Sequence, residues 1–154
     1  DNIAAQTILS STDPKEVKNV FATIGAPFID TKTEPILRVK DYAGFFRVLY
    51  NSTYLNREMS ELALKILSDS EYKSGIVAGI PSNILVAHKF GERSIVNNID
   101  GKTIVEQTQI HDCGIVYYPK MPYILCIMTR GDDFTAQEKA IQELSRFIYV
   151  ELSK

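Results

Sequence analysis

The chain has 154 residues, of which 45% are hydrophobic and 23% charged, and its formal net charge is −2. This composition is ordinary for a globular protein, and near-neutrality gives no electrostatic reason to expect binding to nucleic acid or to an anionic membrane surface. No apolar run reaches the roughly 20 residues that span a bilayer. We therefore expect a globular domain that binds no nucleic acid and has no membrane span.

The first half of the chain predicts four helices in two pairs. Ile3–Leu9 is apolar with small residues interspersed, and Pro14 opens a second helix that Gly25 ends. Two prolines make residues 26–39 a loop. In the second pair, Tyr42, Phe45, Phe46, Val48 and Leu49 crowd one side of the first helix, whereas Asn56 caps the second, whose face is Met59, Leu62, Ala63, Ile66 and Leu67.

The second half predicts an antiparallel sheet and a closing helix. Ile84–Arg93 is a strand, and Asn97–Gly101 has the chemistry of a loop. Ile110–Tyr118 and Tyr123–Thr129 are two apolar strands that scarcely alternate with polar residues, so both faces of the sheet should be covered. The last helix has a capping box of Thr135 with Glu138 and an apolar face of Ile141, Leu144, Ile148 and Leu152. Helices, then a sheet, then one helix predict an α+β sandwich.

The strand at Ile84–Arg93 ends in a cation followed closely by a glycine. A lysine such as Lys89 at the end of a buried strand is costly unless something anionic meets it, and Gly91 lets a ligand or another backbone come near. The pattern fits an anion-recognising strand edge. A plain strand end with a turn glycine is the common alternative for such a short motif.

Cysteine and histidine are scarce in this chain. Cys113 and Cys126 lie on the two arms of the predicted hairpin, as diagonal neighbours, and are too few for a disulfide framework. Between a cross-strand pair and two buried free thiols, we favour the free thiols. His88 and His111 are the only histidines, and no Cys/His cluster has metal-ligand spacing. We expect no metal and no cofactor.

Three motifs in order resemble the C-terminal part of the penicillin-recognising serine hydrolases, and most closely the class A β-lactamase-like group. Asp1–Ala5 resembles the end of that family's Ser-Asp-Asn motif, and Lys89-Phe90-Gly91 resembles its K-[ST]-G strand motif. His111–Val116, followed by a second strand and a helix, is similar to the family's last two strands and closing helix. The match covers essentially the whole chain.

The resemblance implies a β-lactamase/D,D-peptidase-like sandwich, in which helices cover an antiparallel sheet. Residues 1–154 would form a single domain that is incomplete at its N-terminus, because the family's N-terminal strands and nucleophile helix are not in this sequence. A sheet edge would then be left for the missing N-terminal segment or another chain to cover. The resemblance also implies a periplasmic or otherwise extracytoplasmic location.

The resemblance implies roles for several residues of the strand motif. Lys89 would support the serine of the Ser-Asp-Asn motif and attract the substrate carboxylate, and the backbone N–H of Glu92, just after Gly91, would donate to the oxyanion hole. Asn2 would hold the amide side chain of the substrate. A fixed cation and an aligned N–H would stabilise the charge that develops on an acyl carbonyl.

The sequence departs from the family pattern at two sites. Phe90 stands where a Thr or Ser hydroxyl would bond the substrate carboxylate, and a phenyl ring cannot do so. Glu34-Pro35-Ile36-Leu37 resembles the loop that carries the deacylating glutamate, yet Arg38 replaces the Asn that helps to hold water. Glu34 is a candidate general base, and a solvated loop carboxylate is the interpretation we favour.

Three apparent motifs have simpler explanations. Ser70–Lys73 spells S-x-x-K but follows the Ser-Asn position and lies in a polar joint, and Tyr54–Asn56 spells Y-x-N at a helix boundary. His111 and Asp112 are adjacent, so in a strand they face opposite ways and form no dyad. A buried, hydrogen-bonded Asp112 is the role we predict there.

The leading functional hypothesis is a serine hydrolase that forms an acyl-enzyme with β-lactams or D-Ala-D-Ala-type peptides. The family's nucleophile belongs to an S-x-x-K motif upstream of the Ser-Asp-Asn motif, so we expect the 154 residues alone to be inactive. The alternative is a non-catalytic fold relative that acts as a cell-envelope binding or interaction module, favoured by Phe90 and Arg38. A third alternative is an unrelated α+β binding domain.

Overall fold

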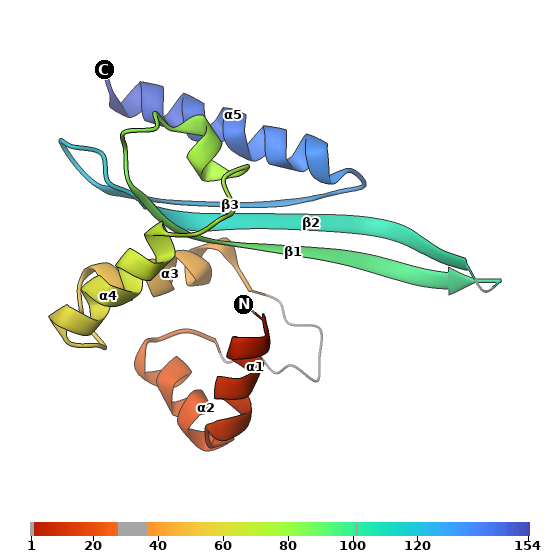
Figure 1. The fold of residues 1–154 in the computed structure, drawn as a ribbon, viewed down its shortest axis with the longest axis horizontal. Coiled ribbons are helices and arrows are strands. Elements are labelled where there is room, and N and C mark those ends of the chain that lie inside the picture. The colour runs from red at the N-terminus through yellow and green to blue at the C-terminus, as the bar shows by residue number, and fades with distance from the viewer. Residues whose placement is uncertain (1, 28–36, 101) are drawn as a thin grey trace.

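The computed structural model describes residues 2–27, 37–100 and 102–154 as an α+β structure. A three-stranded antiparallel sheet of order β1-β2-β3 lies at its centre with helices on both sides (Figure 1), as the sequence predicts. In chain order the elements are α1 (Asn2–Ser11), α2 (Pro14–Thr23), α3 (Val39–Tyr50), α4 (Arg57–Ser68), η1 (Ile76–Gly79), β1 (Val86–Ile99), β2 (Lys102–Val116), β3 (Tyr123–Gly131) and α5 (Phe134–Leu152). Among the described residues, no helix has the length and apolarity to cross a membrane.

Each face of the sheet packs on its own set of helices. Helix α5 and η1 cover one face, which we call the α5 face, whereas α3 and α4 cover the opposite α3 face (Figure 1). The α5 face buries Ile76, Ile80, Val86, Ile110, Val116, Leu125, Ile127 and Ile141. The α3 face buries Phe46, Leu64, Ala87, Cys113 and Ile115. Two covered faces explain the nearly continuous apolar runs in β2 and β3.

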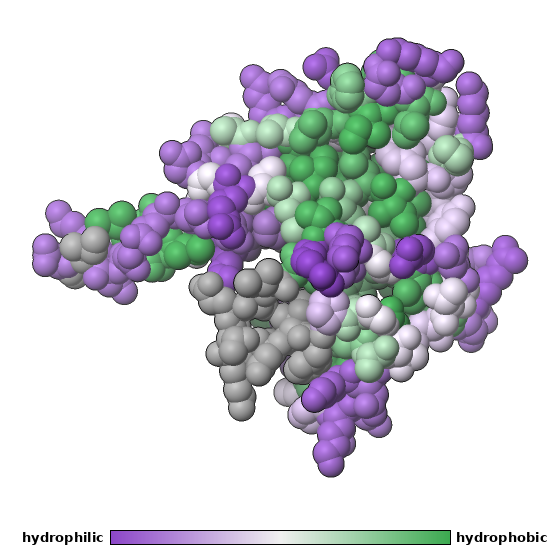
Figure 2. Space-filling view, turned by 180° about the vertical axis from the view of Figure 1, so that it is seen from behind, coloured by the Kyte–Doolittle hydropathy of each residue, from purple (hydrophilic) through white to green (hydrophobic). Residues whose placement is uncertain are grey.

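Strands β1 and β2 are longer than the sequence predicts. Asn97 and Asn98 continue β1, paired with Ile104 and Thr103, so the predicted loop there is wrong. Cross-strand side-chain bonds favour pairing over turn formation, such as Thr103 Oγ1 to Asn98 Oδ1 at 3.0 Å. Because β3 ends opposite Thr108, the ends of β1 and β2 project as a two-stranded ribbon. Figure 2 shows hydrophobic side chains on it, and Val96, Ile104 and Val105 are exposed there.

The N-terminal helices follow the predicted boundaries. The Asp13 carboxylate caps α2 by accepting from Lys15 N at 2.9 Å, with Pro14 in the first turn, and Gly25 ends the helix with φ of +69°. Neither α1 nor α2 contains a buried residue. The ring of Phe21 in α2 meets that of Phe45 in α3 edge-on, with centroids 5.8 Å apart.

Helix α4 has the predicted cap but not the predicted face. Asn56 Oδ1 accepts from Met59 N at 2.8 Å, which confirms the cap. Met59, Leu62 and Ile66 are nevertheless exposed, whereas Ser60 and Leu64 are buried. Leu64 and Leu67 contribute to the core of the α3 face. The small Ser60 side chain lets the helix approach closely, so burial follows the Ser60 side rather than the more apolar side.

Helix α5 begins two residues earlier than predicted. Asp133 is the N-cap and accepts from Thr135 N at 2.8 Å, so the predicted Thr135/Glu138 capping box is wrong. Phe134, now inside the helix, packs against the core of the α5 face. Of the predicted apolar face, Ile141 is buried but Leu144 and Leu152 are exposed. The polar residues Gln137 and Ser145 are buried in their place.

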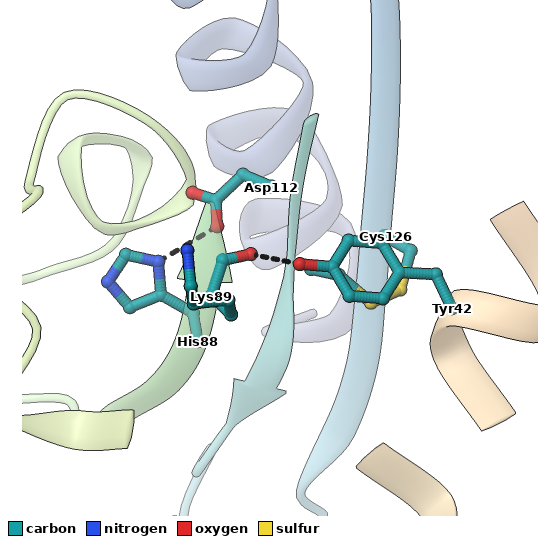
Figure 3. The surroundings of a disulfide bond; sticks show 6 residues. Tyr42, His88, Lys89, Asp112 and Cys126 are labelled. Carbon is teal, nitrogen blue, oxygen red and sulfur yellow. Dashed lines mark hydrogen bonds and ion pairs between the residues drawn. A yellow bond between two sulfur atoms is a disulfide. The ribbon is translucent and has the colours of Figure 1, made fainter. Parts of the chain in front are cut away.

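The two cysteines form a disulfide, which corrects the prediction of free thiols. Cys113 in β2 lies directly opposite Cys126 in β3, not diagonally, with a Cα–Cα distance of 4.0 Å. The pair sits on the α3 face beside Lys89, which is the β1 partner of Cys113 (Figure 3). Sequence spacing could not reveal this pairing, because it depends on the register of the hairpin.

Candidate active-site wall

A groove of about 780 Å³ opens beside β1 at the edge of the α3 face. Residues of β1 from Lys89 to Arg93 and Ile95 line it, together with facing parts of β2 and β3, and Leu37 and Tyr42 border it. Its lining is electropositive, since it contains three cations, Lys89, Arg93 and Arg130, and one carboxylate, Glu92, among the described residues. The strand that the sequence singled out therefore forms one wall of a solvent-filled groove.

Lys89 is an exposed cation of this wall. Its ammonium donates to the backbone carbonyl of Phe90 and lies 4.9 Å from the centre of the Phe90 ring. Its own carbonyl accepts a hydrogen bond of 2.7 Å from the Tyr42 hydroxyl (Figure 3). Burial, with a smaller contribution from the charge of Asp112, raises the pKa of Tyr42 far above its ordinary value. Tyr42 thus stays protonated and ties the strand to α3.

The register of β1 against β2 fixes the direction of the Glu92 N–H. Tyr117 N donates to Leu85 O at 2.9 Å, just before the first pair of the ladder, Val86 with Val116. Hydrogen-bonded and non-hydrogen-bonded pairs alternate in antiparallel sheets, and the register is unbroken from there to Glu92. The N–H of Glu92 and the carbonyl of Phe90 therefore point away from β2, toward an edge with which no described strand pairs.

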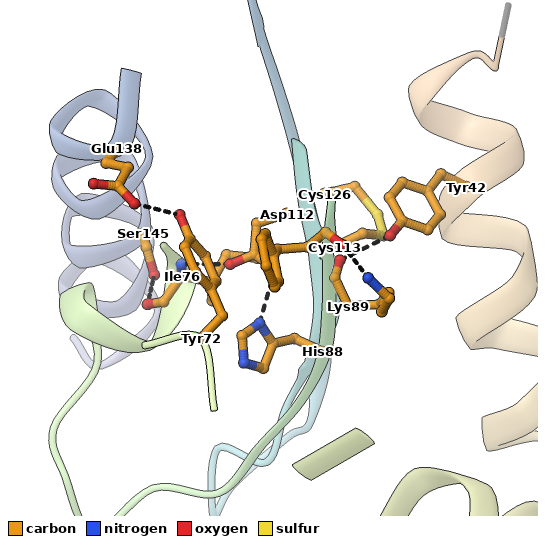
Figure 4. A network of polar contacts seen from close by, with 11 residues as sticks. Tyr42, Tyr72, Ile76, His88, Lys89, Asp112, Cys113, Cys126, Glu138 and Ser145 are labelled. Atoms are coloured by element: carbon orange, nitrogen blue, oxygen red, sulfur yellow. Dashed lines mark hydrogen bonds and ion pairs between the residues drawn. A yellow bond between two sulfur atoms is a disulfide. The ribbon is translucent and has the colours of Figure 1, made fainter. Parts of the chain in front are cut away.

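Phe90 turns to the other side of the sheet. Its ring stacks on Tyr72 with centroids 3.9 Å apart and an interplanar angle of 16°. The Tyr72 hydroxyl donates to Glu138 of α5 at 3.1 Å (Figure 4). The Phe90 side chain thus helps to close the α5 face and presents no polar side-chain atom to the groove.

Asn2, another predicted site residue, is not among the described residues that line the groove. Asn2 is exposed in the first turn of α1, and its side chain makes no hydrogen bond to any residue that the structure describes. Glu34 lies outside the described residues. Gly91 lines the groove, and a side-chain carbon added there would meet nothing within 4 Å. The structure therefore brings Lys89, Gly91 and Glu92 together at the groove, whose described lining does not include Asn2.

A buried polar network behind the wall was only partly foreseen. His88 Nδ1 lies 2.8 Å from Asp112 Oδ1, and Asp112 Oδ2 accepts from Ile76 N at 2.8 Å (Figure 4). The predicted buried, hydrogen-bonded role of Asp112 is confirmed, but its partner His88 was missed. The strand register would have predicted this contact, because His88 pairs with Gly114 and Asp112 is its diagonal neighbour on the same face.

The apparent motifs are placed as the sequence predicts. Ser70–Lys73 is not helical, and Asn56 of Tyr54–Asn56 is the N-cap of α4. His111 lies on the α3 face with Gly91, whereas Asp112 is buried on the α5 face. No cluster of three or more His, Cys, Asp or Glu able to hold a metal ion occurs among the described residues.

Comparisons with known proteins converge on one family. A family model described as the beta-lactamase enzyme family matches residues 1–152. None of the curated proteins matches the sequence. Similar solved structures include PBP-A (TM-score 0.67, 18% identity, 88% of this chain and 50% of that one). The TLA-1 extended spectrum beta-lactamase is similar with a TM-score of 0.71 and 18% identity, over 91% of this chain and 55% of that one. The beta-lactamase from Sphaerobacter thermophilus DSM 20745 is similar with a TM-score of 0.70 and 19% identity, over 95% of this chain and 56% of that one. The chain thus spans about half the length of these structures.

Proposed function

Because the chain belongs to the beta-lactamase enzyme family and has the fold of the penicillin-recognising serine hydrolases, we propose that its 154 residues supply one wall of a serine hydrolase site. The reaction is acyl-enzyme formation with β-lactams or D-Ala-D-Ala-type peptides. The nucleophilic serine comes from a segment outside these residues, and residues 1–154 are one part of a single domain. Family membership removes the alternative of an unrelated α+β domain.

The observation that carries the proposal is the pairing of a cation with an outward N–H. Lys89 is exposed at the groove, and the register turns the Glu92 N–H toward the free strand edge three residues on. An acyl carbonyl placed at that edge gains a donor for its developing negative charge and a cation nearby. Gly91, between them, leaves room for the ligand backbone. Asn2 and Glu34 take the substrate-amide and general-base roles only if the assembled site brings them to this edge.

Acylation by a fluorescent penicillin tests the proposal. We expect no covalent labelling of the 154-residue chain and labelling of a longer chain that includes the upstream S-x-x-K segment. In the longer chain Lys89→Ala should slow acylation by about 100-fold, as loss of a transition-state donor does, whereas Lys120→Ala, on an exposed loop, should not. Labelling of the 154 residues alone would show that the serine lies within them.

A non-catalytic envelope module is the second candidate function. Two features favour it: Phe90 is stacked on Tyr72, and Arg38 is held by Asp41, with Nε 2.6 Å from Oδ2. Phe90 has no hydroxyl to replace that of the family's Thr or Ser, and the Arg38 guanidinium does not replace the side-chain amide of the family's Asn. If the longer chain also resists acylation while it binds penicillin reversibly, the module is the correct assignment.

The free edge of β1 implies a partner for the wall. We propose that another segment, from the same protein or a second chain, covers this edge, since exposed strand edges pair readily. Size-exclusion chromatography should show the 154 residues to be poorly stable or self-associated, and a stable monomer would contradict this. An extracytoplasmic location fits the Cys113–Cys126 disulfide, because disulfides persist in oxidising compartments.

A further inference from the structure

A row of polar side chains crosses all three strands two residues beyond Gly91. Arg93 of β1 pairs with Gln109 of β2, and Gln109 pairs with Arg130 of β3. Directly paired residues share a face, and side chains two apart on a strand do also, so this row lies on the same face as Lys89. All four residues line the groove. The groove therefore has cations at both of its sides.

Arg130 is the member of this row that is available to a ligand. It is exposed and forms no ion pair with any described residue, although Asp132 and Asp133 follow it closely. Asp133 is committed to the cap of α5. Arg93, by contrast, has an interaction of its own, so we assign no role to it.

The titratable and charged groups around Arg130 favour an anion. Burial lowers the pKa of the imidazole of His111, one row away, and the positive charge of Arg130 adds a smaller contribution in the same direction. Glu92, the one acidic residue among the described residues that line the groove, is on β1 and on the alternate side of that strand. Gln109 contributes an amide whose Nε2 makes only a 3.4 Å bond to Gln107. An arginine beside an amide donor is a suitable geometry for a carboxylate.

Strand spacing sets the length of the ligand. Neighbouring strands lie about 4.8 Å apart, so Arg130 stands about 10 Å across the sheet from β1. We propose that Arg130 and Gln109 form a carboxylate-binding subsite for the acyl side chain of the substrate. This inference rests on the proposed function for the position of the acyl carbonyl, at the Lys89–Glu92 edge. The reacting carbonyl lies beyond the outer edge of β1, so the substrate class is an acyl compound whose side chain carries a carboxylate more than about 10 Å from that carbonyl.

Titration of the longer chain that includes the upstream segment, with its nucleophilic serine replaced by alanine so that the penicillins bind without reacting, is followed by NMR amide shifts and tests the subsite. The ligands are a penicillin whose side chain carries a carboxylate, the side-chain ester of that penicillin, and glutarate as a simple dicarboxylate. Arg130→Gln should weaken binding of the acidic penicillin and of glutarate about tenfold, as the loss of one charge-assisted bond implies. The ester should bind wild type and variant alike. Lys120→Gln removes the same charge elsewhere and should change nothing.

The outcomes separate this inference from the proposed function. If the penicillins bind but Arg130→Gln has no effect, the subsite is wrong and the proposed function stands. If glutarate binding depends on Arg130 while neither penicillin binds, the subsite stands and the proposed function fails. If glutarate does not bind the wild type, the subsite is wrong. Gln109→Glu, which adds a negative charge within the row, should weaken glutarate binding without altering the fold.

Discussion

The His88 imidazole and the Asp112 carboxylate meet at 2.8 Å, Nδ1 to Oδ1, where both side chains are completely buried. The other carboxylate oxygen accepts from Ile76 N, so one aspartate joins the site strand β1 to the 3-10 turn η1. The Ser145 hydroxyl then donates to Ile76 O at 2.8 Å and extends the link to α5. The network therefore includes His88, the residue that immediately precedes Lys89.

Removal of the Asp112 carboxylate should be among the most destabilising single changes. Asp112→Ala leaves the Ile76 N–H and His88 buried without their partner, and we expect a loss of about 3 kcal/mol in the free energy of unfolding. Asp112→Asn keeps one acceptor and should cost less. Urea denaturation measures both. Asp132→Ala, at an exposed position, should stay within about 0.5 kcal/mol of wild type, and an equal effect of the two alanines would contradict the assignment.

Gly75 protects the same carboxylate by its lack of a side chain. A carbon added there would lie 2.2 Å from Asp112 Oδ2 and 2.9 Å from Tyr72 Cε1. Gly75→Ala must displace one of them, so we expect a loss of about 2–3 kcal/mol in the free energy of unfolding. Gly91→Ala is the matched control, because its added carbon meets nothing within 4 Å. Thermal unfolding that ranks the two variants in the opposite order would be incompatible with this geometry.

His111 should make the protein less stable as the pH falls below neutrality. Burial, reinforced by the charge of Arg130, lowers the pKa of His111, although a hydrogen bond with the Ile110 backbone opposes the shift. The unfolded chain titrates near the ordinary value of about 6.5. Between the lowered pKa and that value the unfolded state binds more protons, so stability declines with acidification. His111→Gln should flatten this dependence.

The same histidine reports on its distance from Arg130. Removal of the positive charge by Arg130→Gln should raise the pKa of His111 toward its ordinary value, because one of the causes that lower it is gone. An NMR titration of the imidazole carbon-bound protons measures this. An unchanged titration would place Arg130 too far from the groove to act there.

The Cys113–Cys126 bridge should contribute about 2–4 kcal/mol, the usual value for a disulfide that closes a short loop. It joins two residues that are 13 apart in sequence and closes a loop made of the end of β2, the turn and the start of β3. Urea unfolding with and without a thiol reductant should differ by that amount. The double variant Cys113→Ala with Cys126→Ala should already be weakened and should not respond to the reductant. A wild type indifferent to reduction would mean that the hairpin needs no covalent link.

The first residue of α5 can be tested in the same way. Asp133→Ala removes the acceptor for Thr135 N and should cost about 1 kcal/mol. Thr135→Ala should have a smaller effect, because that side chain caps nothing in this position. If Thr135→Ala proves the more costly, the capping box predicted from the sequence is correct after all.

These caps show where sequence reasoning succeeds and where it stops. Asn56 has no other capping residue within two positions and was predicted correctly, whereas Asp133 and Thr135 both have capping side chains and are two residues apart. Burial of Phe134 decides between them, and that depends on the distant core of the α5 face. In α4 the choice between the Met59 and Ser60 sides likewise depends on how closely the helix approaches the sheet.

The site was predictable to the extent that it is local in sequence. Lys89 and Gly91 are two residues apart on a strand that its composition predicts. The pairs His88–Asp112, Cys113–Cys126 and Gln109–Arg130 each join different strands, so they require the register. The register is set by the hairpin turn and by which faces are buried. The turn between β1 and β2 was predicted to begin at Asn97, whereas the strand pairing continues to Ile99.

The projecting ribbon of β1 and β2 divides the sheet into two regions of different local stability. Residues 102–107 pair with a described strand on one side only, and no described helix is packed over Val96, Ile104 and Val105, which remain exposed. Such a segment opens without the rest of the domain unfolding. Amide hydrogen exchange should therefore be fast in the ribbon and slow from Ile110 to Val116. The groove then lies at the boundary between a segment that opens easily and the stable three-stranded part of the sheet.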